Sequence, residues 1–256
     1  MVEKLKRFKE FIFNMIYPEN IKCLICEDDL DDDHPWHICS KCRHDIEPNN
    51  KKICKKCGQP TDNARGYCFE CKSTKWYFKV ARAPMLYSGG IVKLIHKFKE
   101  KEALYLARPI AKMMCDEIVA NNMEFECVTF VPMHKMKKFK RGYNQSELLA
   151  KEISKNFKVP CISKAIVKIK QTKSQAKLNY KERQTNLSSA FECNKPELIK
   201  GRSILLVDDI FTTGATTNEC AKTLYNAGAK EISVITFAHT TLKNEKNMSK
   251  TVDITT

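Results

Sequence analysis

The sequence predicts an α/β protein in which a parallel sheet flanked by helices follows a small cysteine-rich module. Three observations support this fold class. Four C-x-x-C pairs lie within residues 23–71, apolar strands alternate with amphipathic helices after about residue 77, and an acidic, hydroxyl-rich turn follows one of these strands. The 256 residues are enough for one middle-sized domain with a smaller module attached. With 43% hydrophobic residues the chain can bury a core, which excludes wholesale disorder.

Residues 1–20 form an amphipathic segment, with apolar residues at helical spacing: Leu5, Phe8, Ile12, Met15 and Ile16. We expect it to pack on the protein, with attachment to a membrane surface as the alternative. Its apolar stretch is short, is interrupted by charges and has no small-residue cleavage site, so it is not a secretion signal. No apolar run approaches the roughly 18 residues that a membrane-spanning helix needs. The sequence therefore predicts a cytoplasmic protein without a transmembrane segment.

The cysteine-rich module spans residues 21–76 and holds four pairs with one spacing: Cys23/Cys26, Cys39/Cys42, Cys54/Cys57 and Cys68/Cys71. Two thiolates three residues apart on a tight turn can occupy two corners of one zinc tetrahedron. Eight thiolates predict two structural Zn²⁺ sites, which are favoured over disulfides because the expected compartment is reducing. The simplest pairing is sequential, with the first four cysteines at one ion and the last four at the other. A cross-braced pairing of the first pair with the third is the alternative.

Three histidines lie near the first of these sites: His34, His37 and His44. Each could replace a thiolate as a zinc ligand. With four cysteines available, we expect them to be surface residues or to support the ligands from outside.

The expected domain of residues 77–243 begins with two helices, over 91–101 after a Ser88-Gly89-Gly90 break and over about 104–121. A short buried strand at 127–132 is followed by a basic loop, MHKMKKFKRGYNQ, and Asn144 then opens a helix with Glu147 in a capping box. A strand at 203–209, a helix at about 216–227 stopped by Gly228, and a strand EISVITFA complete the sheet. Strand, helix and strand in this order predict parallel pairing. Residues 244–256 form a polar tail.

The most informative motif is the eleven-residue segment 207–217, VDDIFTTGATT. The apolar strand delivers two adjacent carboxylates, Asp208 and Asp209, to the sheet edge, where they can accept hydrogen bonds from vicinal ribose hydroxyls or help to hold a metal ion. Backbone N–H groups of the following turn and helix N-terminus favour a phosphate, and Gly214 permits an otherwise strained backbone. The pattern therefore indicates a phosphorylated sugar as ligand, with an ordinary strand-to-helix turn as the alternative.

VDDIFTTGATT resembles the phosphoribosyl pyrophosphate (PRPP) signature of type I phosphoribosyltransferases. The wider sequence resembles the ComF family of competence-associated proteins, in which a cysteine-rich zinc module precedes such a domain. This resemblance extends over four further segments: FIFNMIYPENIKCLIC, LIHKFKEKE, VPMHKMKKFKRGYNQSELLA and QTKSQAKLNYKERQTNLSSAF. It implies a type I phosphoribosyltransferase-like fold, with a hood over about residues 85–122.

The resemblance also implies roles for individual residues. Asp208 and Asp209 would contact the ribose hydroxyls of PRPP and would be catalytic together with Arg141. Arg141 and Gly142, with nearby His134, occupy the position of the pyrophosphate loop, and Lys99 could reach the site from the first helix. The 5′-phosphate would be wrapped by the loop residues Thr212, Thr213, Gly214, Ala215, Thr216 and Thr217. Mg²⁺ would accompany PRPP, and a flexible loop over 171–183 would close the site with Lys173, Gln175 and Arg183.

The distribution of charge suggests a second ligand. The net charge is +15, and residues 131–183 hold 15 Lys and Arg against three acidic residues. One small ligand does not require so many cations, whereas the phosphates of single-stranded DNA would use them. The candidates for contact with DNA phosphates are Lys135, Lys137, Lys138 and Lys140. The interleaved aromatic residues Phe139, Tyr143, Phe157 and Tyr180 are candidates for stacking on unpaired bases.

Two functional classes follow from the sequence. In the first, an acceptor nitrogen attacks C1 of PRPP as pyrophosphate leaves, and the protein is a phosphoribosyltransferase associated with DNA uptake. In the second, the zinc module and the basic segment bind single-stranded DNA, and PRPP is a ligand or regulator. Proteins of the competence machinery are further expected partners.

Overall fold

The structure is a computed structural model that describes residues 22–31, 36–50, 52–63, 66–100, 103–169 and 190–241. The amphipathic segment 1–20, the expected flexible loop 171–183 with its Tyr180, and the tail 244–256 lie outside the described residues, as does His34.

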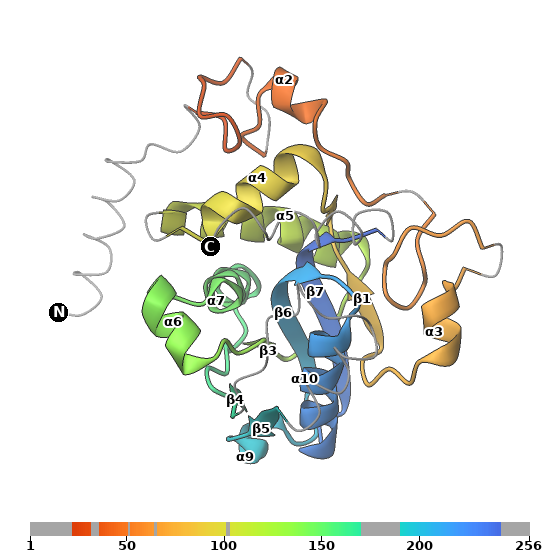
Figure 1. Ribbon diagram of the computed structural model, residues 1–256. Helices are drawn as coiled ribbons and strands as arrows, with labels where there is room; N and C mark the ends of the chain where they lie inside the picture. The colour runs from red at the N-terminus through yellow and green to blue at the C-terminus, as the bar shows by residue number, and fades with distance from the viewer. Residues whose placement is uncertain are drawn as a thin grey trace.

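The centre of the molecule is a parallel sheet with the strand order β1-β7-β6-β3 (Figure 1). These strands are β1 (Val80–Arg82), β7 (Glu231–His239), β6 (Ser203–Phe211) and β3 (Cys127–Phe130). The short strand β2 (Met85–Leu86) also pairs with β7 and continues the line of β1 along it. Every neighbouring pair in this sheet is parallel, which confirms the predicted fold class.

Helices cover both faces of the sheet. The helices are α4 (Gly89–Phe98), α5 (Ala107–Ala120) after the 3₁₀ turn η1 (Ala103–Leu106), α7 (Gln145–Phe157) and α10 (Ala215–Asn226). One face packs on α5 and α7, and the opposite face packs on α10 (Figure 1). Beside α10 lie β4 (Ile166–Lys168) and β5 (Phe191–Cys193), which form an antiparallel pair, and the one-turn helix α9 (Pro196–Ile199). Within the described ranges, no helix is long and apolar enough to cross a bilayer.

The central strand β6 is apolar on both faces because both are covered. Leu205 and Val207 belong to the core cluster formed with α5 and α7. Ile204 and Leu206 alternate with them and belong to the cluster formed with α10. A continuous apolar run is typical of a central parallel strand, and Asp208 and Asp209 interrupt this run near the carboxyl end of β6.

Two local expectations differ from the structure. The basic segment after β3 contains a helix, α6 (Lys135–Arg141), where the sequence suggested a loop. The His134 side chain accepts a hydrogen bond from the Met136 N–H, and Gly142 ends the helix with φ 92°. The predicted capping box at α7 is also wrong in part. The Asn144 side chain accepts from the Ser146 N–H as expected of a cap, but the Glu147 carboxylate forms salt bridges with Lys138 and Lys151 instead of bonding to the Asn144 N–H.

The cysteine-rich module forms two ribbons, one around Cys23–Cys42 and the other around Cys54–Cys71. The two ribbons pack on different parts of the domain. The first, with the one-turn helix α2 (Ser40–Arg43), lies over α4 (Figure 1). Gly89 has φ +47° and leaves no room for a Cβ, which would lie 2.0 Å from the Asp45 carbonyl oxygen. The second ribbon, with α3 (Phe69–Ser73), lies beside β1, where the Ala81 N–H donates to the Lys56 carbonyl at 2.8 Å.

Candidate functional site

Three separate elements, β6, α7 and α4, meet at the acidic pair that lies near the carboxyl end of β6. The Oγ of Ser146, in the first turn of α7, donates to Asp208 Oδ1 at 2.8 Å. Lys99, which caps the C-terminal end of α4, places its Nζ 3.5 Å from Asp209 Oδ2. The carboxylates are thus at the carboxyl edge of the sheet, where ligands bind in open α/β folds. Sequence reasoning named both aspartates and Lys99, but it did not find Ser146.

The end of α4 is held in place by the segment before α7. The Tyr143 hydroxyl donates to the Phe98 carbonyl at 2.8 Å and also to the Glu100 carbonyl. Gln145 Nε2 donates to the same Phe98 carbonyl at 3.4 Å. These bonds fix the residues on either side of Lys99 and so hold its side chain near the aspartates. The expectation that Tyr143 stacks on a base is therefore wrong, since this ring is 9% exposed and its hydroxyl is used internally.

The surroundings of the acidic pair change the chemistry of Asp208. Burial, and then the neighbouring Asp209, raise the pKa of Asp208 to about 8, although the Ser146 hydroxyl and Lys99 oppose the shift. The Asp208 carboxyl therefore holds a proton at neutral pH. A protonated Asp208 beside an Asp209–Lys99 ion pair leaves this part of the site nearly neutral before a ligand arrives.

The loop after β6 has the geometry expected of a phosphate-binding turn. Gly214 is buried with φ +73°, a left-handed conformation that favours glycine, and it precedes the first helical residue of α10. The Thr213 Oγ1 accepts a hydrogen bond from the Ala215 N–H at 3.4 Å. Thr217 is 2% exposed and donates its hydroxyl to the Gly214 carbonyl, so in this structure that hydroxyl stabilises the turn itself. Thr212 and Thr216 belong to the same turn and are half-buried.

Arg141 and Gly142 follow β3, the strand next to β6, so the two loops lie at the same edge of the sheet. The Arg141 Nη1 donates to Gln145 Oε1 at 2.8 Å. Because Gln145 also binds the end of α4, Arg141 belongs to the hydrogen-bonded group that positions Lys99.

Helix α6 presents basic and apolar side chains to solvent. Its four lysines, Lys135, Lys137, Lys138 and Lys140, are exposed. Phe139 is 92% exposed and Met136 is 64% exposed, whereas Lys138 forms a salt bridge with Glu147 at 2.6 Å. Phe157 is not available for stacking on a base, because it packs against Phe125 with ring centroids 5.2 Å apart. Phe139 is therefore the one of the three described candidate aromatics that the structure leaves exposed.

The eight C-x-x-C cysteines form two tetrads with the sequential pairing: Cys23, Cys26, Cys39 and Cys42, and Cys54, Cys57, Cys68 and Cys71. Within each tetrad the sulfur atoms all lie within 4.8 Å of one another. The Cys26–Cys39 and Cys57–Cys68 sulfur atoms are both 3.7 Å apart, close to the roughly 3.8 Å that Zn–S bonds of about 2.3 Å give in a tetrahedron. The tetrads therefore fit two structural Zn²⁺ ions, and neither His37 nor His44 belongs to one.

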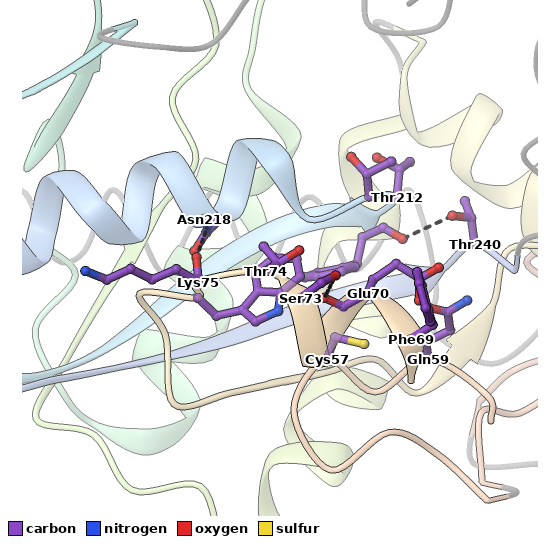
Figure 2. Close-up of a pocket in the computed structure, with 13 residues that line it drawn as sticks. Cys57, Gln59, Phe69, Glu70, Ser73, Thr74, Lys75, Thr212, Asn218 and Thr240 are labelled. Atoms are coloured by element: carbon purple, nitrogen blue, oxygen red, sulfur yellow. Dashed lines mark hydrogen bonds between the residues drawn. The ribbon is translucent and has the colours of Figure 1, made fainter. Parts of the chain in front are cut away.

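A cleft that the sequence did not reveal lies between the second ribbon and the phosphate loop (Figure 2). Its volume is about 700 Å³, and one wall is formed by residues 69–70 and 73–76. Phe211, Thr212, Thr213 and Asn218 line the opposite side. Tyr77 and Asn218, which lie far apart in the sequence, are joined by a hydrogen bond of 2.8 Å from the Tyr77 N–H to Asn218 Oδ1. Residues so distant carry no local sequence signal of contact.

Comparison with known protein families finds two separate matches in the chain. Residues 12–72 match the double zinc ribbon domain, and residues 144–255 match the phosphoribosyl transferase domain. The first match contains all eight cysteines of the tetrads, and the second contains the acidic pair and the phosphate loop.

Similar proteins match most of the chain. The DNA utilization protein YhgH of Escherichia coli K12 is 29% identical over 219 residues, which cover 83% of this chain and 94% of the relative. The competence protein F of Haemophilus influenzae is 29% identical over 229 residues, covering 84% and 95%. The competence protein ComFC of Bacillus subtilis is 24% identical over 235 residues, covering 84% and 92%.

Two adenine phosphoribosyltransferases are among the solved structures to which the chain shows a partial similarity. The Saccharomyces cerevisiae enzyme is 16% identical, with a TM-score of 0.35 over 61% of this chain and 79% of that chain. The Thermoanaerobacter pseudethanolicus enzyme is 15% identical, with a TM-score of 0.35 over 55% and 81%.

Proposed function

We propose that the chain, which joins a double zinc ribbon to a phosphoribosyl transferase domain as its competence and DNA utilization relatives suggest, is a ComF-type protein that binds PRPP at the carboxyl edge of its sheet and acts in DNA uptake or utilisation. The observation that carries the proposal is the meeting of Lys99 and Ser146 with the acidic pair, beside a glycine-containing loop at a helix N-terminus. A pentose phosphate with vicinal hydroxyls matches that arrangement of carboxylates and backbone N–H groups.

In the proposed complex, each end of PRPP has its own protein partners. Asp208 and Asp209 accept hydrogen bonds from the ribose 2′ and 3′ hydroxyls, and residues 212–217 surround the 5′-phosphate. Arg141, Gly142 and Lys99 lie toward the pyrophosphate. Mg²⁺ brought by PRPP would supply further positive charge there, and the acidic pair offers it oxygen atoms. The ion pair between Lys99 and Asp209 would then open, which frees the ammonium for a phosphate.

The reaction proposed for this site is transfer of the phosphoribosyl group. An acceptor nitrogen forms a bond to C1, the bond from C1 to the pyrophosphate oxygen breaks, and the electron pair leaves with pyrophosphate. The transition state has positive charge on the ribose and growing negative charge on pyrophosphate. Arg141 and Lys99 are the described residues that we assign to the stabilisation of the leaving group.

Release of pyrophosphate from PRPP, measured with each nucleobase and with single-stranded DNA as acceptor, tests the enzymatic proposal. Release that depends on one acceptor is the expected result. PRPP binding without release under any of these conditions would exclude transfer to them and would leave PRPP as a ligand.

The exposed surface of α6 favours a second candidate function, the binding of single-stranded DNA. Its lysines can neutralise phosphates, and the 92% exposed Phe139 can stack on an unpaired base. In this alternative the protein is a non-catalytic competence protein in which PRPP regulates DNA binding. Fluorescence anisotropy with an oligonucleotide tests it, and wild-type protein that does not bind at low salt would exclude it.

A further inference from the structure

The segment 75–78 joins the second ribbon to the sheet and runs along the back of the phosphate loop. It begins four residues after the zinc ligand Cys71, just beyond the turn where the Thr74 N–H donates to the Glu70 carbonyl at 3.0 Å. It ends just before β1, and the next residue, Lys79, donates its N–H to the Ile232 carbonyl of β7 at 2.7 Å. We call residues 75–78 the strap.

Asn218 fastens the strap to the first turn of α10. Its Oδ1 accepts from the Tyr77 N–H at 2.8 Å, and its Nδ2 donates to the Lys75 carbonyl at 3.0 Å. Its own N–H donates to the Gly214 carbonyl at 2.8 Å. One side chain therefore satisfies two backbone groups of the strap, while its backbone closes the turn that the phosphate loop forms.

The Trp76 ring packs against the phosphate loop. Its ring lies 6.4 Å from that of Phe211 and 5.0 Å from that of Phe78. A Cβ on Gly214 would lie 2.8 Å from Trp76 Cζ3 and 2.4 Å from Phe211 Cζ. The two rings thus fill the space behind Gly214, the residue whose left-handed conformation shapes the loop.

The second tetrad belongs to the same packed group. Cys54, Cys57 and Cys68 are buried in the core cluster that also contains Phe78 and Phe211. The ribbon has a second attachment at β1, where the Ala81 N–H and the Arg82 guanidinium donate to the Lys56 and Lys55 carbonyls. A ribbon of this length has little core of its own, so bound metal supplies most of its order. Loss of metal would release the strap at the end that is attached to the ribbon.

We propose that Trp76 and Asn218 are positioning residues through which the second ribbon holds the phosphate loop in its binding conformation. Metal at the second tetrad and phosphate at the loop then stabilise one another, and linkage requires that each raise the affinity for the other by the same factor. The inference rests on the proposed function for its ligand, but the mechanical connection can be measured without that ligand.

The test compares hydrogen exchange of the amides of residues 212–218 among zinc-loaded variants. Asn218→Ala and Trp76→Leu are expected to raise this exchange about tenfold, because they remove the hydrogen bonds and the ring that hold the loop. Trp76→Phe is expected to keep the slow amide exchange of the wild type, unlike Trp76→Leu. The Trp76 indole N–H has no partner among the described residues, so the ring alone fills the space behind the loop. Phe69→Ala is the matched control, because it truncates an 80% exposed ring of the same ribbon that lines the cleft.

The reciprocal measurement is zinc release to a chelator. Asn218→Ala is expected to speed release from the second tetrad by a factor similar to the increase in exchange, and to leave the first tetrad unchanged. Cys71→Ser, which disables the second tetrad, is expected to raise exchange at 212–218 and to weaken ribose 5-phosphate binding about tenfold. Should Cys71→Ser fail to fold, Asn218→Ala still gives both readouts.

The outcomes separate this inference from the proposed function. If the wild type binds neither ribose 5-phosphate nor PRPP, the proposed function fails, and exchange and zinc release still decide the role of the strap. Exchange at 212–218 that is the same in wild type, Asn218→Ala and Trp76→Leu would overturn the inference, whatever the protein binds. So would equal effects of Phe69→Ala and Trp76→Leu.

Discussion

The raised pKa of the Asp208 carboxyl links the stability of the fold to pH. Its pKa is about 8 in the folded protein and about 3.9 in an unfolded chain, so the folded state keeps a proton that the unfolded state releases. The contribution of Asp208 to the free energy of unfolding therefore falls as pH rises from about 4 to about 8, and this contribution falls no further above that window.

Asp208→Asn tests this link, because an amide of nearly the same shape stays neutral. We expect the variant to gain about 1–3 kcal/mol in free energy of unfolding at pH 8.5, and less at pH 6.5. Urea denaturation at the two pH values measures the difference. The matched control is Asp116→Asn, which alters an exposed carboxylate paired with Lys112 on α5. A variant less stable than the parent at pH 8.5 would contradict the assigned protonation of Asp208.

Gly214 and Gly142 give a second test at the scale of single residues. Both have left-handed backbones, with φ +73° and +92°, but a Cβ on Gly142 meets nothing within 4 Å. Gly142→Ala is expected to cost about 1 kcal/mol of backbone strain. Gly214→Ala adds overlap with Trp76 and Phe211 and is expected to cost at least about 2 kcal/mol. Thermal or urea unfolding measures both losses of stability. Equal losses in Gly142→Ala and Gly214→Ala would show that the space behind Gly214 is not filled.

At the scale of single elements, the two ribbons are expected to release metal at different rates. Cys26 of the first tetrad is exposed, whereas Cys54, Cys57 and Cys68 of the second are buried at 5% exposure or less. A chelator therefore reaches the first site more easily. We expect two zinc ions per chain as isolated and a biphasic release, with Cys26→Ser removing the faster phase. A single ion per chain, or loss of the slower phase in Cys26→Ser, would contradict this account.

Helix α6 is predicted to carry the interaction with DNA phosphates. Changing Lys137, Lys138 and Lys140 to Gln is expected to flatten the log–log dependence of affinity on salt by about two units, since each single-strand phosphate contributes about 0.7. PRPP binding is expected to survive, because the phosphate loop is a separate element. Loss of PRPP affinity with unchanged DNA affinity would assign these lysines to pyrophosphate instead.

The sequence predicted elements best where local pattern and burial agree. Strand β6 and helix α10 were expected from an apolar run and from the Gly228 stop, and they lie within two residues of their expected bounds. Helix α6 was missed because its apolar side chains, Met136 and Phe139, point to solvent and give no buried stripe. Good helix formers, a His134 cap and a glycine at its end were the signals that could have found it.

At the scale of the whole molecule, the sequence predicted the order of the modules and the sequential pairing as its simplest choice. It could not predict how the parts meet. The contacts of Asn218 with the strap and of Tyr143 with the end of α4 join segments far apart in the chain. Such contacts depend on how β1, β7, β6 and β3 are ordered in the sheet, which no local pattern encodes. The contact of Ser146 with Asp208 could not be predicted for the same reason, because Ser146 reaches Asp208 only where α7 packs on β6.

Calorimetric titration of the zinc-loaded protein with PRPP and Mg²⁺ gives the clearest test of the proposed function. We expect one PRPP per chain, and we expect Asp209→Asn to weaken binding at least about tenfold, or about 1.4 kcal/mol. Asp116→Asn is expected to bind as the parent does. A folded protein with both zinc ions that binds no PRPP, or that binds it equally well without the Asp209 carboxylate, would contradict the assignment of this site.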